Sequence, residues 1–509
     1  MSYTMFAAIQ VGSNEISMKI YEISKKYGIK EINYLRSSVE IGAETYRNNN
    51  LSHNVINNIC DILLDFKQIM KDYGVLDYVA IASSAIREAQ NSIVVLDRIK
   101  ITTGIKVKVI SNSEKRFLYY KAVTLKNEEF NNMINKSTAM VDVGAGSIQI
   151  SLYNKGALVV TQNIRLGFLR IIEMLTEFSA QSKNYASLIE EYINNDLNTF
   201  RKLILNNDSI QNIIAVGDNM NEFSKVCLED VKDNILSYED FKKIYEKLLT
   251  QPLDVIASQY NISMEQAVLM LPTAMIYMKM FEIANSDNMW IPGVHLNDGI
   301  ALDYAIKNQN LAAKHDFSGD IIAAARVIAS KYKCDSLHTD NVEYIALKIF
   351  DSIKKIHGMG KRERLLMQLA VILHNCGAYI NMNEVLINSY NIIMSTEIMG
   401  LANSERNMIA NIVKSITYDI PLLNDLKGTI NKDDYIIIGK ITAILRLADA
   451  LDKSHLQKFN KINIDVTNGI MTITAYTLAD ITLEKGLFDK SSGFFTEVYG
   501  IKPKIKRKK

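Results

Sequence analysis

The feature that most restricts the fold of this chain is a short internal repeat. Residues 7–21 (AAIQVGSNEISMKIY) align without gaps on residues 139–153 (AMVDVGAGSIQISLY), 132 positions later. Each copy has an apolar strand, a glycine-containing turn and a second strand with alternating apolar residues, which is the pattern of a tight β-hairpin. We therefore predict a duplicated fold with one hairpin in each of two lobes.

Helical and strand-like patterns alternate around the two hairpins, as in an α/β fold. Helical spacing occurs at residues 54–73, 114–125 and 264–283, and short apolar strands occur at 77–83, 107–110 and 210–217. From about residue 316 helical patterns dominate, at 321–332, 342–357, 362–373, 404–413 and 435–451. Near the end, Asn468 and Gly469 fit a two-residue turn that places Val466 opposite Met471.

These patterns divide the 509 residues into five parts. We predict a first lobe at 1–127, a second lobe at 128–309, an all-α domain at 310–458, a small α+β module at 459–500 and a basic tail at 501–509. Because the tail is dominated by Lys and Arg, we expect it to be frayed and solvated.

The composition is that of a folded globular protein, with 48% hydrophobic and 22% charged residues. A net charge of +2 gives no overall attraction to nucleic acid or to a membrane surface, so we expect neither partner. The N-terminus lacks a signal-peptide pattern, and the apolar stretch 267–281 is interrupted by Pro272 and Lys279, so we expect a cytoplasmic protein. The four cysteines show no paired spacing that would indicate disulfides or a zinc site.

Glycine turns at the ends of buried strands expose backbone N–H groups, and such turns suit phosphate oxygens. The candidate phosphate-binding residues of the two hairpins are Gly12, Ser13, Asn14, Gly144, Gly146 and Ser147. Gly217 ends another strand and could reach the same cleft, or could form an ordinary turn. Ser83 and Arg87 follow the strand at 77–83, and a guanidinium suits bidentate phosphate contact, although a surface arginine is the simpler alternative.

Several of these motifs, in this order, resemble the exopolyphosphatase and guanosine pentaphosphate phosphohydrolase (Ppx/GppA) family. The resemblance is carried by residues 7–14, 84–91, 109–111, 141–147, 166–167 and 297–299, and by 444–455 in the helical part. It implies two lobes of the actin and Hsp70 type, which is a duplicated ribonuclease-H-like fold, followed by an HD-like helical domain. It also implies a homodimer, and the release of terminal phosphate from polyphosphate or guanosine pentaphosphate with acidic residues and a divalent ion.

The chain departs from the family at its acidic residues. Gln10 stands where the family has aspartate, Gln149 where it has glutamate, and Lys115 where it has the glutamate credited with activating water. Neither glutamine nor protonated lysine can accept a proton as a general base. The cleft is about four charge units more positive than that of the family, so it should attract anions and repel a divalent cation, for which Asp142 remains nearly the only hard ligand.

Three hypotheses follow from this pattern. In the favoured one the chain binds polyphosphate or a guanosine polyphosphate without efficient hydrolysis, with Lys115 and Arg87 partly replacing the metal. In the second the chain is an active phosphohydrolase that uses Glu114, Asp142 and Mg²⁺. The third is a small-molecule kinase of the same superfold, which would need a nucleotide-binding glycine pair that the segment at Gly217 lacks.

In the helical domain, the resemblance places His338, His374 and Asp449 at the metal-ligand positions of HD phosphohydrolases. Asn375 replaces the carboxylate of the His-Asp pair, and a neutral amide is a poor transition-metal ligand. Ser389 lies in a segment where the longer relatives usually carry another histidine. We therefore expect no bound metal, and His374 to be a packing residue.

Overall fold

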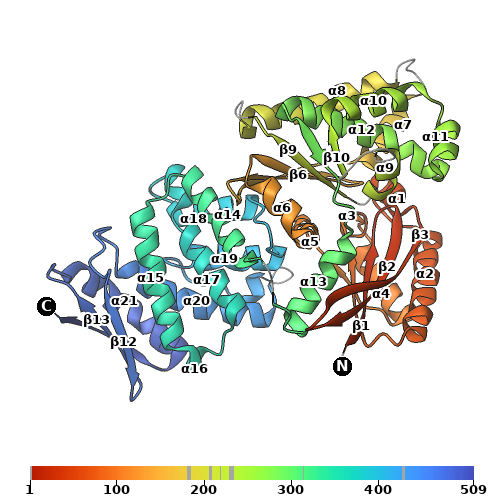
Figure 1. The fold of residues 1–509 in the computed structure, drawn as a ribbon. Coiled ribbons are helices and arrows are strands. Elements are labelled where there is room, and N and C mark those ends of the chain that lie inside the picture. The colour runs from red at the N-terminus through yellow and green to blue at the C-terminus, as the bar shows by residue number, and fades with distance from the viewer. Residues whose placement is uncertain are drawn as a thin grey trace. The chain divides into compact units, whose positions relative to one another are not determined.

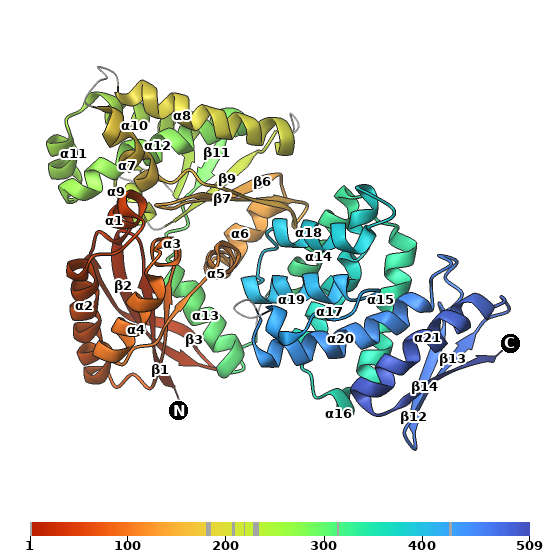
Figure 2. The same cartoon turned by 180° about the vertical axis from the view of Figure 1, so that it is seen from behind.

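The structure is a computed structural model that describes residues 3–179, 185–205, 209–217, 219–227, 234–312, 315–426 and 430–508. The chain divides into two compact units, residues 1–316 and 317–509. The first unit contains two mixed β-sheets with their helices, and the second is mainly helical (Figures 1 and 2).

The first lobe has a five-stranded sheet in the order β3-β2-β1-β4-β5. Its strands are β1 (Thr4–Val11), β2 (Glu15–Ser24), β3 (Gly28–Ser38), β4 (Asp77–Ala82) and β5 (Val107–Val109). Its helices are α1 (Ile41–Asn48), α2 (His53–Asp72), α3 (Ser84–Glu88), α4 (Ser92–Thr103), α5 (Asn112–Thr124) and α6 (Asn127–Ile134). Helix α2 begins at Ser52, whose hydroxyl accepts a hydrogen bond from Val55 N, and its apolar face enters the core beneath the sheet.

The second lobe has a six-stranded sheet in the order β10-β11-β9-β6-β7-β8. Its strands are β6 (Thr138–Val143), β7 (Ile148–Asn154), β8 (Ala157–Ile164), β9 (Asn212–Val216), β10 (Ile235–Ser237) and β11 (Asn288–Trp290). The helical segments around it are α7 (Phe168–Ser179), α8 (Tyr185–Phe200), η1 (Arg201–Leu205), α9 (Met220–Cys227), α10 (Tyr238–Thr250), α11 (Leu253–Tyr260) and α12 (Met264–Ala284).

The predicted duplication is confirmed by strand pairing. In the first lobe β1 pairs antiparallel with β2 and parallel with β4, and in the second lobe β6 pairs in the same way with β7 and β9. Each hairpin closes with one backbone hydrogen bond, from Gly12 N to Glu15 O at 2.9 Å and from Gly144 N to Ser147 O at 3.0 Å. The two turns are therefore equivalent in geometry as well as in sequence.

Helix α13 (Leu296–Asn308) ends the first unit and packs against α5, β1 and β2 of the first lobe. Tyr304 stacks on Phe6 with ring centroids 4.0 Å apart, and Asn297 Nδ2 donates to Ala8 O at 2.8 Å. The predicted second lobe at 128–309 therefore differs from the structure at its last helix, which returns to the first lobe. Asn297, in the motif at 297–299, therefore helps to hold α13 against the first lobe.

Helix α12 is apolar on all sides because it lies in the core of the second lobe. It is the one helix among the described residues that is long and apolar enough to cross a membrane, and 78% of its most apolar window is buried inside the protein. Such burial is typical of a core helix.

The second unit begins with a set of helical segments. These are α14 (Phe317–Lys331), α15 (Ser336–Ser352), α16 (Lys354–His357), α17 (Lys361–Leu373), η3 (Cys376–Tyr379), α18 (Val385–Ser395), α19 (Asn403–Lys414), η4 (Leu423–Leu426) and α20 (Lys432–Ala450). They are followed by β12 (Ile462–Thr467), β13 (Ile470–Tyr476), α21 (Thr482–Tyr499) and β14 (Lys502–Lys508). The predicted hairpin is confirmed, because Val466 pairs with Met471 and Ile464 with Ile473.

The prediction of a frayed basic tail is wrong. Strand β14 pairs in parallel with β13 and forms the edge of a three-stranded sheet, β12-β13-β14. Pro503 is buried and Ile505 is half-buried, whereas Lys502 and Lys504 between and beside them are exposed. The high lysine content hid this alternation, which is the pattern of a strand with one solvated face.

Candidate phosphate-binding site

Each glycine turn is held by the helix that follows the third strand of its lobe. Gly42 N, at the start of α1, donates to Ser13 O at 2.7 Å, and Leu169 N, at the start of α7, donates to Ala145 O at 3.1 Å. A Cβ on Gly167 would lie 2.2 Å from Ala145 O, so only glycine allows this approach. In both lobes, a backbone N–H at the start of a helix thus holds a carbonyl oxygen of the turn.

Lys115 and Asp142 form a buried ion pair beside the second turn. Lys115 Nζ on α5 lies 3.5 Å from Asp142 Oδ2 on β6, and the two side chains are 6% and 3% exposed. A Cβ on Gly144 would lie 3.3 Å from the same ammonium, and one on Gly217 would lie 3.1 Å from Asp142 Oδ1. The structure therefore brings together four residues that the sequence predicted for the site from separate segments.

The strands behind this ion pair are linked by a tyrosine that the sequence did not suggest. The Tyr277 hydroxyl on α12 lies 3.2 Å from Val141 O on β6 and 3.1 Å from Val216 O on β9. Burial raises the pKa of Tyr277 well above its ordinary value, so the hydroxyl stays protonated. This contact fixes the ends of two adjacent strands at the point where Asp142 and Gly217 meet.

The two glutamines lie at non-equivalent places in the repeat, because Gln10 aligns with Asp142 and Gln149 aligns with Ser17. Gln149 on β7 is directly opposite Asp142, and Gln10 on β1 is opposite Ser17. Both glutamine side chains are buried. At the second hairpin the Lys115 ammonium lies beside the Asp142 carboxylate and occupies the place of a cation, which disfavours a divalent metal ion at that carboxylate.

A cluster of three hydroxyl groups lies at the first turn. The Tyr46 hydroxyl is 3.3 Å from Ser13 Oγ and 3.0 Å from Ser84 Oγ, and the two serine oxygens are 3.4 Å apart. Burial raises the pKa of Tyr46, although its hydrogen bonds with the two serines act in the opposite direction. Tyr46 is thus protonated at neutral pH, and a Cβ on Gly146 of the second turn would lie 2.5 Å from its hydroxyl.

Arg170 joins the second turn to the first lobe. Its Nε donates to Gly146 O at 3.0 Å, its Nη2 pairs with Glu88 Oε2 at 2.6 Å, and its guanidinium lies 4.8 Å from the Tyr46 ring centre. Sequence reasoning missed both Arg170 and Tyr46. Arg170 follows the Leu166-Gly167 motif by three residues, which is the only signal that could have identified it.

Arg87, Ser83, Asn14 and Ser147 make hydrogen bonds within the protein, and these bonds do not test whether the four residues bind phosphate. Arg87 Nη1 donates to Ile110 O and Nη2 to Asn112 Oδ1, both at 2.7 Å, so the guanidinium ties α3 to the segment before α5. Ser83, Asn14 and Ser147 each accept a backbone hydrogen bond through their carbonyl oxygens. Their contact with phosphate stays a prediction.

Glu114, considered as a catalytic residue, lies in a capping arrangement at the start of α5. Its Oε2 accepts from Ser111 N at 2.9 Å, the Ser111 hydroxyl accepts from Glu114 N at 3.2 Å, and Oε1 pairs with Lys108 Nζ at 2.7 Å. This reciprocal arrangement is a capping box at the start of α5. Because both carboxylate oxygens are engaged there, the geometry gives no support to Glu114 as the base that activates water.

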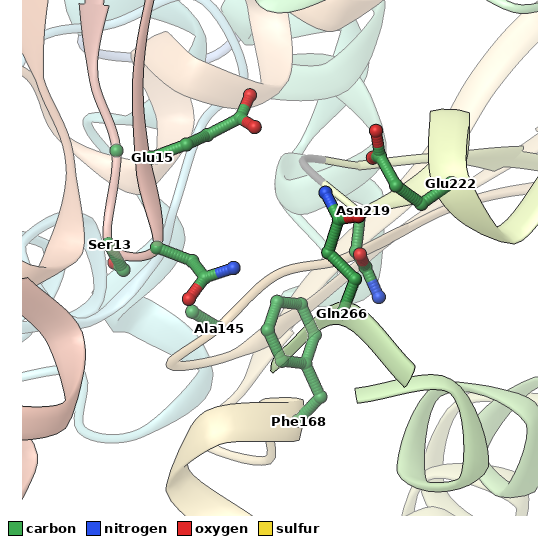
Figure 3. Close-up of a pocket in the computed structure, with 9 residues that line it drawn as sticks. Ser13, Glu15, Ala145, Phe168, Asn219, Glu222 and Gln266 are labelled. Atoms are coloured by element: carbon green, nitrogen blue, oxygen red, sulfur yellow. The ribbon is translucent and has the colours of Figure 1, made fainter. Parts of the chain in front are cut away.

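A pocket lies between the first turn and the second lobe (Figure 3). Ser13 and Glu15 are on one side, and Asn219, Glu222 and Gln266 are on the other. Glu222 is buried and forms an ion pair with Arg36 on β3 of the first lobe. Gly12 and Asn14 also line the pocket, so three of the predicted phosphate-binding residues lie in its wall together with the carboxylates of Glu15 and Glu222.

Comparison with known proteins identifies the family of this chain. Residues 20–308 match the Ppx/GppA phosphatase family, and residues 322–487 match its domain III. The chain belongs to the Ppx/GppA phosphatase family. Its first unit has the actin-like α/β fold of Ppx/GppA proteins, followed by a helical C-terminal region.

Among Ppx/GppA relatives, a protein of Vibrio atlanticus named guanosine-5'-triphosphate,3'-diphosphate pyrophosphatase is 19% identical over 507 residues, which cover 97% of each chain. A protein of the same name from Photobacterium profundum is 19% identical and covers 87% of this chain and 86% of its own. The crystal structure of an exopolyphosphatase from Cytophaga hutchinsonii has a TM-score of 0.53 at 17% identity, covering 61% of this chain and 99% of its own.

Proposed function

We propose that this protein binds inorganic polyphosphate or guanosine penta- or tetraphosphate beside its two glycine turns, and that hydrolysis is weak or lost. The buried ion pair between Lys115 and Asp142 is the observation that carries the proposal. Lys115 stands where the resemblance places the glutamate that activates water, and an ammonium paired with a carboxylate holds its proton. The site keeps its means of binding an anion and lacks the base that would cleave it.

The groups available to the anion are of three kinds. Backbone N–H groups of the turns other than Gly12 N and Gly144 N, which close the hairpins, and protonated hydroxyls such as that of Tyr46 can donate to phosphate oxygens. The Lys115 ammonium supplies a charge that a bound metal would otherwise supply. This arrangement supports binding that does not depend on a divalent cation.

The second candidate function is hydrolysis, as the names of the relatives suggest. The retained Asp142 and the 97% coverage of the V. atlanticus pyrophosphatase favour it. The geometry at Glu114 does not, because that carboxylate caps α5. We further propose that the second unit is an HD-like domain that serves dimer contacts and the binding of long polymers.

The affinity for polyphosphate and for guanosine pentaphosphate, measured in EDTA and in Mg²⁺, tests the binding proposal. We expect the dissociation constants in the two conditions to agree within about threefold, because the cation in the site is a lysine. Binding that appears only in Mg²⁺ would contradict this.

Phosphate release tests the loss of hydrolysis. We expect negligible turnover in the wild type and Mg²⁺-dependent release in the variant that combines Lys115→Glu, Gln149→Glu and Gln10→Asp, which restores the acids of the family. Lys108→Glu, at an exposed lysine before α5, is the matched control and should release none. Wild-type turnover that disappears in Asp142→Asn would establish the active-enzyme alternative instead.

A further inference from the structure

Three side chains of the second unit converge at a point that the phosphate site does not use. They are His338 on α15, His374 at the end of α17 and Asp449 on α20, and all three are buried. His338 Nε2 lies 3.3 Å from His374 Nε2, and Asp449 Oδ1 lies 3.8 Å and 3.7 Å from these two nitrogens. One ligand atom from each of three helices therefore faces a common centre.

Hydrogen bonding determines which nitrogen of each ring carries its proton. His374 Nδ1 lies 2.6 Å from Val371 O, and a carbonyl can only accept, so Nδ1 is the donor. His338 Nδ1 lies 2.8 Å from Asp452 Oδ2, and the other oxygen of that carboxylate accepts from Gln457 N. In the neutral rings the lone pairs therefore lie on the two Nε2 atoms, which face each other and the Asp449 carboxylate.

Two lone pairs and an anionic oxygen at this separation repel one another unless a cation lies among them. A circle through three points with these separations has a radius of about 2.1 Å, which is the usual length of a bond from a divalent transition metal to imidazole nitrogen or carboxylate oxygen. The contacts behind the ligands also match those of metal centres, where the second ring nitrogen donates to a carboxylate or a carbonyl. Asp449 Oδ2 is oriented in a similar way by Lys453 Nζ at 3.2 Å.

We propose that the second unit binds one divalent transition-metal ion through His338 Nε2, His374 Nε2 and Asp449 Oδ1. Two imidazoles and one carboxylate favour zinc, cobalt, nickel or iron over magnesium and calcium. The expectation of no metal rested on Asn375 and on the histidine missing at Ser389, and this set of three ligands requires neither of those side chains. His374 and Asp449 also line a pocket with Asn375 and Lys453, so the remaining coordination position opens to water or an oxygen anion.

Metal content and cobalt spectroscopy of the full chain test the proposal. After treatment with chelator and dialysis against Zn²⁺ or Co²⁺, we expect one ion per chain, and visible absorption of the Co²⁺ form that reports nitrogen and oxygen ligands. His374→Gln and Asp449→Asn should each weaken Zn²⁺ binding at least tenfold. Neither readout depends on polyphosphate binding or hydrolysis, so the result is independent of the proposed function.

His357→Gln is the matched control, because His357 is also a buried histidine of the second unit. Its ring contacts Phe350 O and Met359 N instead of the cluster, so its variant should keep the metal. X-ray absorption of the wild-type Zn²⁺ form gives a readout that requires no variant to fold, and it should show scattering from two imidazoles. The proposal would be overturned by absence of stoichiometric metal binding, by a spectrum without imidazole scattering, or by undiminished binding in Asp449→Asn. In that case a proton shared between His338 Nε2 and His374 Nε2 would be the cation that offsets their repulsion.

Discussion

Lys115 and Asp142 place two opposite charges where little of either side chain is exposed to water. Removing an ammonium and a carboxylate from water is costly, and the attraction within the pair offsets that cost only while both partners remain. The pair also lies against Gly144 and Gly217, where a side chain would be too close. A change at either charge therefore affects stability as well as binding.

Lys115→Met should destabilise the protein by about 3 kcal/mol, because it leaves the Asp142 carboxylate buried without its ammonium partner. The double variant with Asp142→Asn should recover most of that loss, since it buries neither charge. The midpoint of urea unfolding measures both effects. Lys108→Met, whose side chain is 67% exposed, is the control and should shift the midpoint little. Equal destabilisation in the single and double variants would show that the ion pair is not the cause.

The residues of the site could be predicted from the sequence only where they belong to a contiguous motif. Gly12, Gly144 and Lys115 were predicted because each lies in a recognisable segment. Tyr46 and Arg170 were missed because their importance comes from a packing contact between the lobes that no local pattern encodes. The three candidate metal ligands were identified singly, but their common centre depends on the packing of α15, α17 and α20, which the sequence does not give.

At the scale of elements, the crossing of α13 over α5 determines how the chain returns to the first lobe. A Cβ on Gly299 would lie 1.9 Å from Leu118 O, so the two helices approach at backbone distance. Asp298 extends this contact to β2 through Tyr21 at 2.6 Å and Lys19 at 3.0 Å. The motif at 297–299 is therefore best explained by packing, with no ligand required.

Gly299→Ala should cost about 2 to 3 kcal/mol, because the added methyl group forces the two helices apart. Gly486→Ala in α21 is the matched control, since nothing lies within 4 Å of its added Cβ. This control should be neutral or stabilising by about 1 kcal/mol, as alanine favours helix. Thermal unfolding of both variants measures the difference, and similar melting temperatures would argue against a close crossing.

Where periodicity was strong, the sequence predicted some elements to within a few residues, but it gave no prediction for others, among them α4, α8 and α10. Helix α2 was expected at 54–73 and lies at His53–Asp72, and the strand expected at 77–83 is β4. Helix α18 was not predicted, because its apolar residues show no clear amphipathic spacing. Strand β14 was missed because its pairing with β13 depends on a contact across α21, which separates the two strands in the chain.

At the scale of the whole first unit, ion pairs among the described residues join the two lobes. Arg47 on α1 pairs with Glu173 on α7 at 2.7 Å, Glu88 pairs with Arg170, and Arg36 pairs with Glu222. Partly exposed pairs of this kind each contribute modestly and are screened by salt. Together they hold the two lobes in contact at a modest energy.

The double variant Arg47→Met and Arg170→Met should increase hydrogen exchange in α1 and α7 by about fivefold, corresponding to roughly 1 kcal/mol of lost contact. Mass-spectrometric exchange measures this, and high salt should produce a similar change in the wild type. Lys243→Met, which removes a pair within α10, should leave both helices unchanged. If exchange in the double variant matches the wild type, these pairs do not hold the lobes together.

Strand β14 lies at the edge of its sheet, and this position affects the tendency of the protein to self-associate. An edge strand exposes unpaired backbone groups to which a strand of another chain can add, and this addition begins many forms of aggregation. Here the exposed face of the edge strand carries Lys502, Lys504 and Lys506. Their mutual repulsion across an approaching strand discourages such stacking, so the basic segment protects the sheet from self-association.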